Sequence, residues 1–131
     1  MTTKLLQPSA ENIPEITSVS IRTLRDSNSI DATLAVTHID CSISDYIRVN
    51  LLTDTMLSFS NAVKEGQQVT IALFQADSIP HVVTYDTMVR LGTDIFSFPD
   101  LSGTINMLDR IVFIYDSFSG SYDLVGYSRG Y

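Results

Sequence analysis

The chain has 131 residues, 8 of them Lys or Arg and 15 Asp or Glu, which gives a formal net charge of -7. The basic residues are scattered singly, so no basic stripe could neutralise a run of phosphates, and an anionic membrane would repel the chain; nucleic acid and membrane partners are therefore not expected. A domain of this length can bury a core without disulfides, and the single cysteine, Cys41, is predicted to be a small buried hydrophobe.

The first 18 residues, MTTKLLQPSAENIPEITS, are predicted to form an extended arm. Pro8 and Pro14 fix the backbone φ and push the residues before them toward extended geometry. A frayed terminus is the alternative. The segment has no apolar run typical of a signal peptide or membrane span, so we expect folding in the cytoplasm where the chain is made. Pro8 and Pro14 are candidate interaction residues, because an extended arm can lie along another surface.

From residue 19 onward the sequence favours β-strands almost throughout. Runs of β-branched and aromatic residues are separated by the turn-forming segments RDSNS, NAVKEGQ and LGTD. A helix would need apolar residues at three-and-four spacing over about ten positions, and the best candidate, 102–110, is too short. The predicted strands occupy 18–25, 30–43, 46–52, 55–60, 68–75, 80–86 and 87–91.

The last 23 residues or so, from Asp109 onward, predict a hairpin, because apolar residues alternate on both sides of the turn DSFSG. The segment EGQ predicts a second hairpin loop, where Gly66 permits a positive φ. Together these strands predict an all-β fold, an antiparallel β-sandwich or jelly-roll-like barrel over 19–131. The predicted core consists of Leu57, Phe59, Val69, Ile71, Leu73, Ile111, Phe113, Tyr115 and Leu124.

The tyrosines of the C-terminal hairpin predict a contact surface. Tyr115 is expected in the core, whereas Tyr127 and Tyr131 should reach the rim of the sheet, where a ring can be buried while its hydroxyl finds a partner. We expect the segment GYSRGY to lie at a subunit or capsid contact, with Arg129 pairing an acidic residue of a neighbour. A loose, solvated tail is the alternative.

Motifs that carry chemistry are not found in the sequence. His38 and His81 have no second ligand at zinc spacing, and no serine lies in G-x-S-x-G. The glycines near the C-terminus precede a strand rather than a helix, and RDSNSID lacks the Gly and Glu of a calcium loop. We therefore expect neither an enzyme nor a metal or cofactor site, and both histidines should be structural or surface residues.

Three blocks of the sequence occur in a distinctive order: TMLSFSNAVKEGQQVTIALFQ, HVVTYDTMVRL and DRIVFIYDSFSGSYDLVGYSRG. Together they resemble a β-rich module of structural proteins in tailed bacteriophages, found in capsid-decorating proteins, head fibres and tail fibres. The resemblance covers roughly residues 50–131. The chain departs from the pattern at Tyr85, where the module often has Trp, and residues 1–45 have no counterpart in it.

The resemblance implies an interaction module without catalytic residues, usually trimeric and located on a virion. We expect a capsid decoration or cement protein that binds the major capsid protein or other virion proteins at the capsid surface. A homotrimer is expected also because cyclic closure buries strand edges. The alternatives are a tail-fibre, head-fibre or collar component involved in host attachment, and a carbohydrate-binding β-sandwich.

Overall fold

The computed structural model describes residues 28–95 and 97–131. This part of the chain forms nine strands in two sheets and contains no helix, so it includes none long and apolar enough to cross a membrane. The predicted arm with Pro8 and Pro14, and the predicted strand at 18–25, lie outside the described residues.

The strands lie where the alternating sequence runs predict them, with one division. The run 30–43 contributes to two strands, because the chain bends between Ala32 and Val36. The segment 102–110, the best helix candidate, forms a turn and then enters a strand. The strands are β1 (Asn28–Ala32), β2 (Val36–Asp40), β3 (Tyr46–Leu51), β4 (Thr55–Ser60), β5 (Gln68–Gln75), β6 (Val83–Tyr85), β7 (Val89–Arg90), β8 (Leu108–Asp116) and β9 (Ser121–Ser128).

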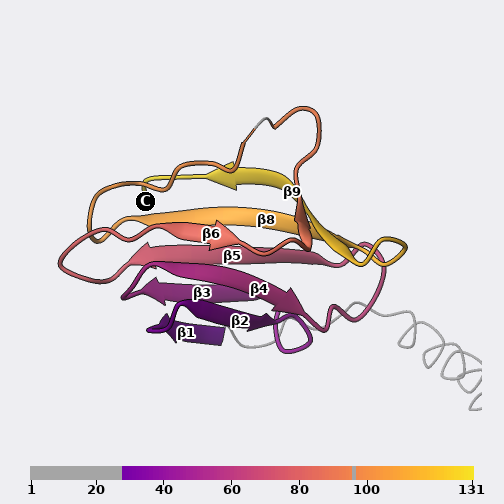
Figure 1. The fold of residues 1–131 in the computed structure, drawn as a ribbon, viewed down its shortest axis with the longest axis horizontal. Coiled ribbons are helices and arrows are strands. Elements are labelled where there is room, and N and C mark those ends of the chain that lie inside the picture. Colours follow the sequence, from indigo (N-terminus) through magenta and orange to yellow (C-terminus); the bar gives the residue numbers. More distant parts are fainter. Residues whose placement is uncertain (1–27, 96) are drawn as a thin grey trace, which may run out of the picture.

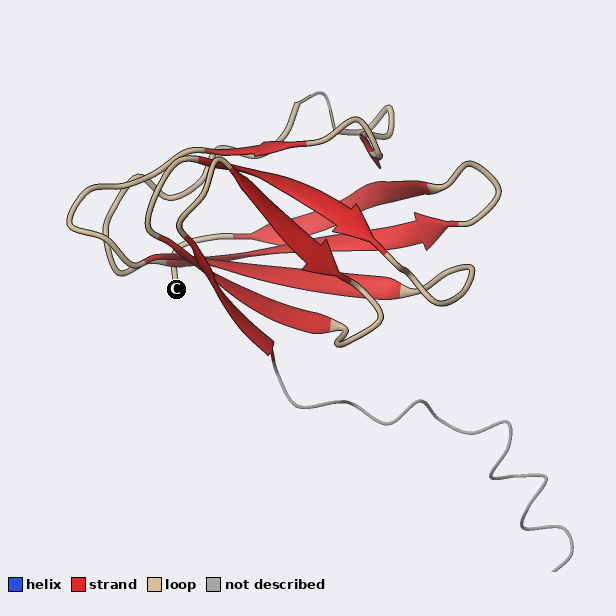
Figure 2. Cartoon of the chain, turned by 60° about the horizontal axis from the view of Figure 1, so that its bottom comes forward, coloured by secondary structure: helices blue, strands red, loops and turns tan. Residues whose placement is uncertain are grey.

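Successive strands alternate between the two sheets as far as β7. The larger sheet has the order β1-β3-β5-β8-β9-β7, and the smaller sheet has the order β2-β4-β6 (Figure 1). The two sheets form separate layers (Figure 2). Each connection from β1 to β7 therefore carries the chain from one layer to the other.

The prediction of an antiparallel fold is correct only for the C-terminal part of the larger sheet. The pairs β5–β8 and β8–β9 are antiparallel, and the second is the predicted hairpin. The other five pairs, β1–β3, β2–β4, β3–β5, β4–β6 and β7–β9, are parallel. In the first four of these pairs the chain leaves the sheet and returns to it without reversing its direction, so strands two apart in the sequence become parallel neighbours. In the fifth pair, β7 and β9 lie in the same sheet as the strand between them in the sequence, β8.

The segment EGQ shows this difference directly. Gly66 has the positive φ that the sequence predicts, 79°. The loop nevertheless joins β4 of the smaller sheet to β5 of the larger one, so it is not a hairpin loop. Gln67 fixes this connection from inside, because its side chain is 3% exposed and donates to the carbonyl of Cys41 at 2.8 Å.

The core lies between the two sheets. The ring of Phe59 in β4 contacts that of Phe113 in β8 across the layers, with centroids 4.9 Å apart. Cys41 is fully buried as predicted. The predicted core residues Leu57, Phe59, Val69, Ile71, Leu73, Ile111, Phe113 and Leu124 are all buried, and Tyr115 packs against them half-buried.

Candidate functional site

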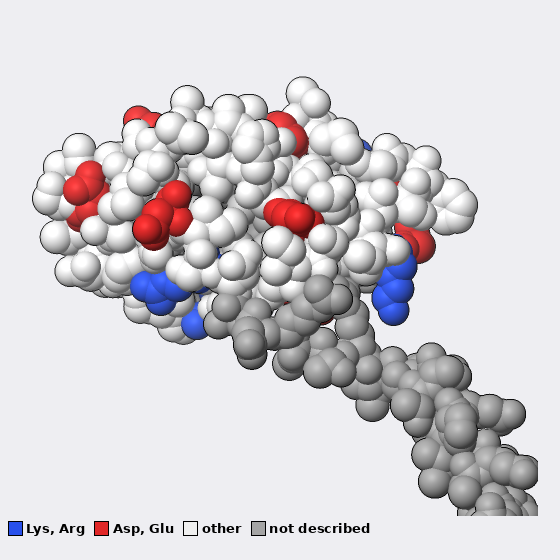
Figure 3. All heavy atoms as spheres, turned by 90° about the horizontal axis from the view of Figure 1, so that it is seen from below, with Lys and Arg blue, Asp and Glu red and all other residues white. Residues whose placement is uncertain are grey.

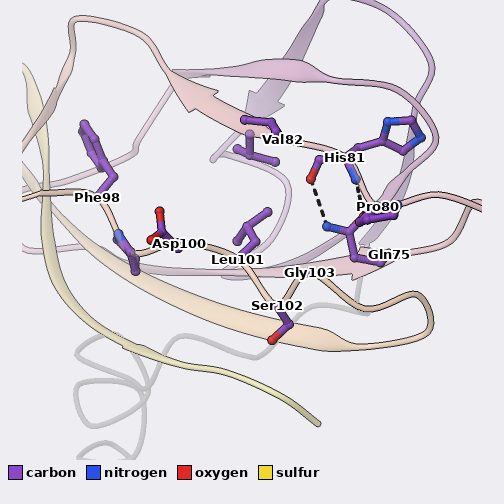
Figure 4. Close-up of a pocket in the computed structure, with 11 residues that line it drawn as sticks. Gln75, Pro80, His81, Val82, Phe98, Asp100, Leu101, Ser102 and Gly103 are labelled. Carbon is purple, nitrogen blue, oxygen red and sulfur yellow. Dashed lines mark hydrogen bonds between the residues drawn. The ribbon is translucent and has the colours of Figure 1, made fainter.

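A pocket of about 360 Å³ opens between the segment 80–83, which leads into β6, and the loop 98–103 (Figure 4). Its volume lies near the lower end of the roughly 300–1,000 Å³ range of small-molecule sites. Most of its wall is apolar. The lining residues are Gln75, Pro80, His81, Val82, Val83, Phe98, Pro99, Asp100, Leu101, Ser102 and Gly103.

Gln75, the last residue of β5, holds one wall of the pocket in place. Its side-chain amide donates to the carbonyl of His81 at 2.9 Å and accepts the His81 N–H at 2.8 Å, as Figure 4 shows by dashed lines. Its main chain is bonded to Met107 and Asn106. Because Gln75 is 2% exposed and bonded through both ends of its amide, it positions the wall and is not a recognition group for a ligand.

Asp109, at the start of β8, holds the opposite wall. Its carboxylate accepts the N–H of Ser102 at 2.6 Å, the hydroxyl of Ser102 at 2.7 Å and the N–H of Gly130 at 2.9 Å. Asp109 is 2% exposed. A buried carboxylate needs such donors, and here they come from two segments. Asp109 therefore ties the pocket loop to the C-terminal residues.

The predicted contact residues Tyr127 and Arg129 lie beside this loop. The guanidinium of Arg129 donates to the main-chain carbonyl of Asp100 at 2.7 Å and lies 5.9 Å from the ring centroid of Tyr127. Tyr127 is 48% exposed, so it reaches the rim of the sheet as predicted. Within the chain Arg129 has a carbonyl as its partner, and its pairing with an acidic residue of a neighbour stays a prediction.

Tyr131 lies on the other side of the larger sheet. Its main chain exchanges two hydrogen bonds with Leu108, at 2.9 and 3.1 Å, so the end of the chain is not the loose tail of the alternative. Its ring is 61% exposed and lies 5.0 Å from the guanidinium carbon of Arg110. The structure therefore brings Tyr127 and Arg129 to the pocket but not the ring of Tyr131, while Pro8 and Pro14 lie outside the described residues.

His81 is held between two carboxylates, and the sequence did not reveal this arrangement. Its Nε2 lies 2.8 Å from Asp77 and its Nδ1 lies 3.1 Å from Asp54, and its side chain is only 10% exposed. Both ring nitrogens are therefore occupied, which leaves neither for proton transfer to a ligand. The hydrogen bond to Asp77 raises the pKa of His81, Asp54 adds to this effect, and burial opposes it.

This raised pKa predicts a loss of stability on the alkaline side. Protonated His81 stabilises the fold below the unfolded pKa of about 6.5, and this contribution is lost as the pH rises through the higher folded pKa. The pKa values of Asp54 and Asp77 are lowered, so both stay ionised across this window. Urea unfolding at about pH 6 and about pH 9 should show a decrease in unfolding free energy that is smaller in His81→Gln. An equal decrease in both proteins would contradict this.

The remaining reactive groups do not converge on the pocket. Burial raises the pKa of Cys41 to about 11, so its thiol stays protonated at neutral pH and is a poor nucleophile. Among residues 28–95 and 97–131, no group of three His, Cys, Asp or Glu side chains could hold a metal ion. The mostly apolar wall of the pocket is suited to covering an apolar group.

The pocket residues were not among those predicted from the sequence. Phe98 and Leu101 come from an irregular segment without the periodicity that reveals a strand. Val82 belongs to the run 80–86 that predicts a strand, but β6 begins only at Val83. The one local signal is the run FPDLSG, in which apolar residues interrupt turn formers. Comparison with protein-family models, with curated proteins and with solved structures gave no match to this chain.

Proposed function

We propose that this protein is a structural protein of a tailed-bacteriophage virion, a decoration protein that binds and stabilises the head shell. The resemblance of residues 50–131 to phage structural modules supports this role. The observation that carries a binding role is the pocket itself. Its walls are mostly apolar, and the buried polar groups that hold those walls, on Gln75 and Asp109, are bonded within the chain.

The pocket end of the domain suits a contact with another protein subunit. Tyr127 is half-exposed beside the pocket loop, and Val82 in the opposite wall is 63% exposed. Exposed aromatic residues next to an apolar depression are typical of the centre of protein interfaces. We take this end as a contact between subunits of a homotrimer, and the arm at 1–18 as the attachment to the capsid.

The two layers are best described as a β-sandwich within this proposal. Among residues 28–95 and 97–131, each sheet has two outer strands that pair on one side only, β1 and β7 in one sheet and β2 and β6 in the other, which favours a sandwich over a closed barrel. The acidic side chains on the face seen in Figure 3 are dispersed, which suits a solvated surface.

Deleting residues 1–18 should abolish attachment to capsids and leave the β domain folded, because the predicted arm supplies the contact with the shell. The measurement is co-sedimentation with particles that lack the protein, together with circular dichroism of the truncated chain. Deleting residues 129–131 is the matched control, since it should weaken self-association and leave attachment by the arm intact. Undiminished attachment of the truncated chain would contradict the role of the arm.

Electron micrographs of particles with and without the protein test the virion role itself. Added density at regular sites over the shell is expected for a decoration protein. Density at one vertex or on the tail would favour the collar or fibre alternative. A full-length protein that does not bind particles would overturn the proposed function.

A further inference from the structure

A phenylalanine projects from the tip of the C-terminal hairpin. Phe118 lies in the turn between β8 and β9 and is 92% exposed, more than any other large apolar side chain of the described residues. A single exposed apolar residue is common, and aromatic residues are enriched in protein interfaces relative to the rest of the surface. Val63, in the neighbouring loop between β4 and β5, is also 53% exposed.

The turn that carries Phe118 is fixed by several hydrogen bonds. The carboxylate of Asp116 accepts the N–H of Phe118 at 3.1 Å and the hydroxyl of Ser119 at 2.7 Å. Gly120 has a φ of 68°, and its N–H donates to the carbonyl of Asp116 at 2.8 Å. Because the backbone of the turn is already ordered, inserting the ring into a partner would lose little additional backbone entropy.

Two contacts brace this turn against the rest of the domain. Glu65 accepts the N–H of Ser117, which joins the turn to the loop between β4 and β5. Arg90 of β7 lies 3.1 Å from Asp116 and 2.8 Å from Asp123. The backbone of the turn that carries Phe118 is therefore held against the loop between β4 and β5 and against β7.

The turn and the pocket lie at opposite ends of the same strands. In β5 the turn end is Gln68 and the pocket end is Gln75, and at about 3.3 Å per residue these ends lie roughly 23 Å apart. In β8 the pocket end is Asp109 and the turn end is Asp116. Figure 1 shows the β8–β9 turn and the C-terminus on opposite sides of the domain.

We propose that Phe118 of one copy enters the pocket of a second copy of this chain. This assignment rests on the proposed function, because it names the occupant of the pocket that we take as a subunit contact. A projection at one end and a pocket at the other give a heterologous, head-to-tail contact, in which every copy offers both surfaces. Such contacts close into a ring when the rotation between copies allows it and otherwise form an open chain of copies. A ring of three copies would match the homotrimer of the proposed function.

The two surfaces are complementary in polarity. The pocket offers Val82, Phe98 and Leu101 to an aromatic ring, and no polar group of Gln75 or Asp109 would lose its partner on insertion. Lys64, exposed in the loop beside the turn, and Asp100, exposed at the pocket rim, have no ion-pair partner among the described residues. An ion pair between them would orient the contact more than strengthen it.

The test uses the full chain and three variants, studied by sedimentation velocity over a range of concentrations. Phe118→Asp removes the projection, and Val82→Glu places a charge in the pocket at a position that is 63% exposed. Leu34→Asp, at a residue that is 70% exposed and outside both surfaces, is the matched control. The first two variants should weaken self-association more than roughly tenfold, and the control should associate like the wild type.

A mixture of the two defective variants gives the sharper result. Phe118→Asp keeps an intact pocket, and Val82→Glu keeps an intact Phe118. In the mixture, Phe118 of the Val82→Glu copy can enter the pocket of the Phe118→Asp copy. The two surfaces that remain are both defective, so no second contact forms. We expect each variant alone to be monomeric and the equimolar mixture to form a one-to-one dimer that does not grow further.

Three outcomes would overturn this inference. The wild type could stay monomeric at all concentrations, or Phe118→Asp and Val82→Glu could associate like the wild type. The equimolar mixture of these two variants could also stay monomeric. If Val82→Glu lost attachment to particles while Phe118→Asp kept normal association, the pocket would hold a capsid segment instead. The full-length protein could fail to bind particles while its self-association is still weakened by Phe118→Asp and by Val82→Glu. This result would overturn the virion role and leave the head-to-tail contact standing.

Discussion

Phe113→Ala should lower the free energy of unfolding by about 3–5 kcal/mol. Phe113 is fully buried in β8, and its ring contacts Phe59 at 4.9 Å and Tyr85 at 6.1 Å between centroids. Phe59 and Tyr85 belong to the smaller sheet, so removing the ring leaves a cavity at the contact between the two layers. Urea unfolding followed by circular dichroism measures the loss as a lower midpoint.

Phe118→Ala is the matched control for this experiment. It removes the same side chain from the same hairpin, but Phe118 is 92% exposed and contributes little to the core. We expect its effect on the unfolding free energy to stay within about 0.5 kcal/mol. If the two substitutions destabilised the chain equally, the hairpin would not pack as described.

Asp109→Ala should destabilise the chain by about 2–4 kcal/mol and open the pocket loop, because Ser102 and Gly130 would lose their acceptor. Asp109→Asn keeps one oxygen in the same shape and should lose less. Hydrogen exchange at the amides of Ser102 and Gly130 measures the local effect, and urea unfolding measures the global one. Slow exchange at both amides in Asp109→Ala would show that another group holds the loop.

The positions of the strands could be predicted from the sequence, whereas their partners could not. The alternation of apolar residues in TMLSFS and QVTIALFQ depends only on which side of each strand is buried, and both strands bury one side in the core. The same alternation suits a hairpin and a connection that crosses between sheets. After Gly66 the chain enters β5 of the larger sheet, and the side chain of Gln67 donates to the carbonyl of Cys41, a contact between distant positions that the local pattern does not contain.

The candidate site was harder to predict, because its important contacts join distant segments. Asp109 stands at the start of the predicted hairpin, where an aspartate is usually solvated, yet it is buried and bonded to Ser102 and Gly130. Tyr127 and Arg129 were found from their place at the end of a hairpin. Predicting the pocket beside them would have required the position of the loop 98–103, and the sequence of this loop has no regular pattern.

The alternation of strands between the two sheets affects how the chain folds. Asn28 pairs with Ile47 and Val36 with Met56, about 20 positions apart, whereas Ile71 pairs with Ile111 about 40 positions later. Closing a shorter loop loses less conformational entropy. The early strand pairs should therefore form readily, each new strand pairing with a strand that is already in place. We therefore expect order to propagate from β1 and β2 toward β5 while the chain is still emerging from the ribosome. The hairpin β8–β9 forms locally and docks last, so the rate-limiting step of refolding should be its docking onto β5.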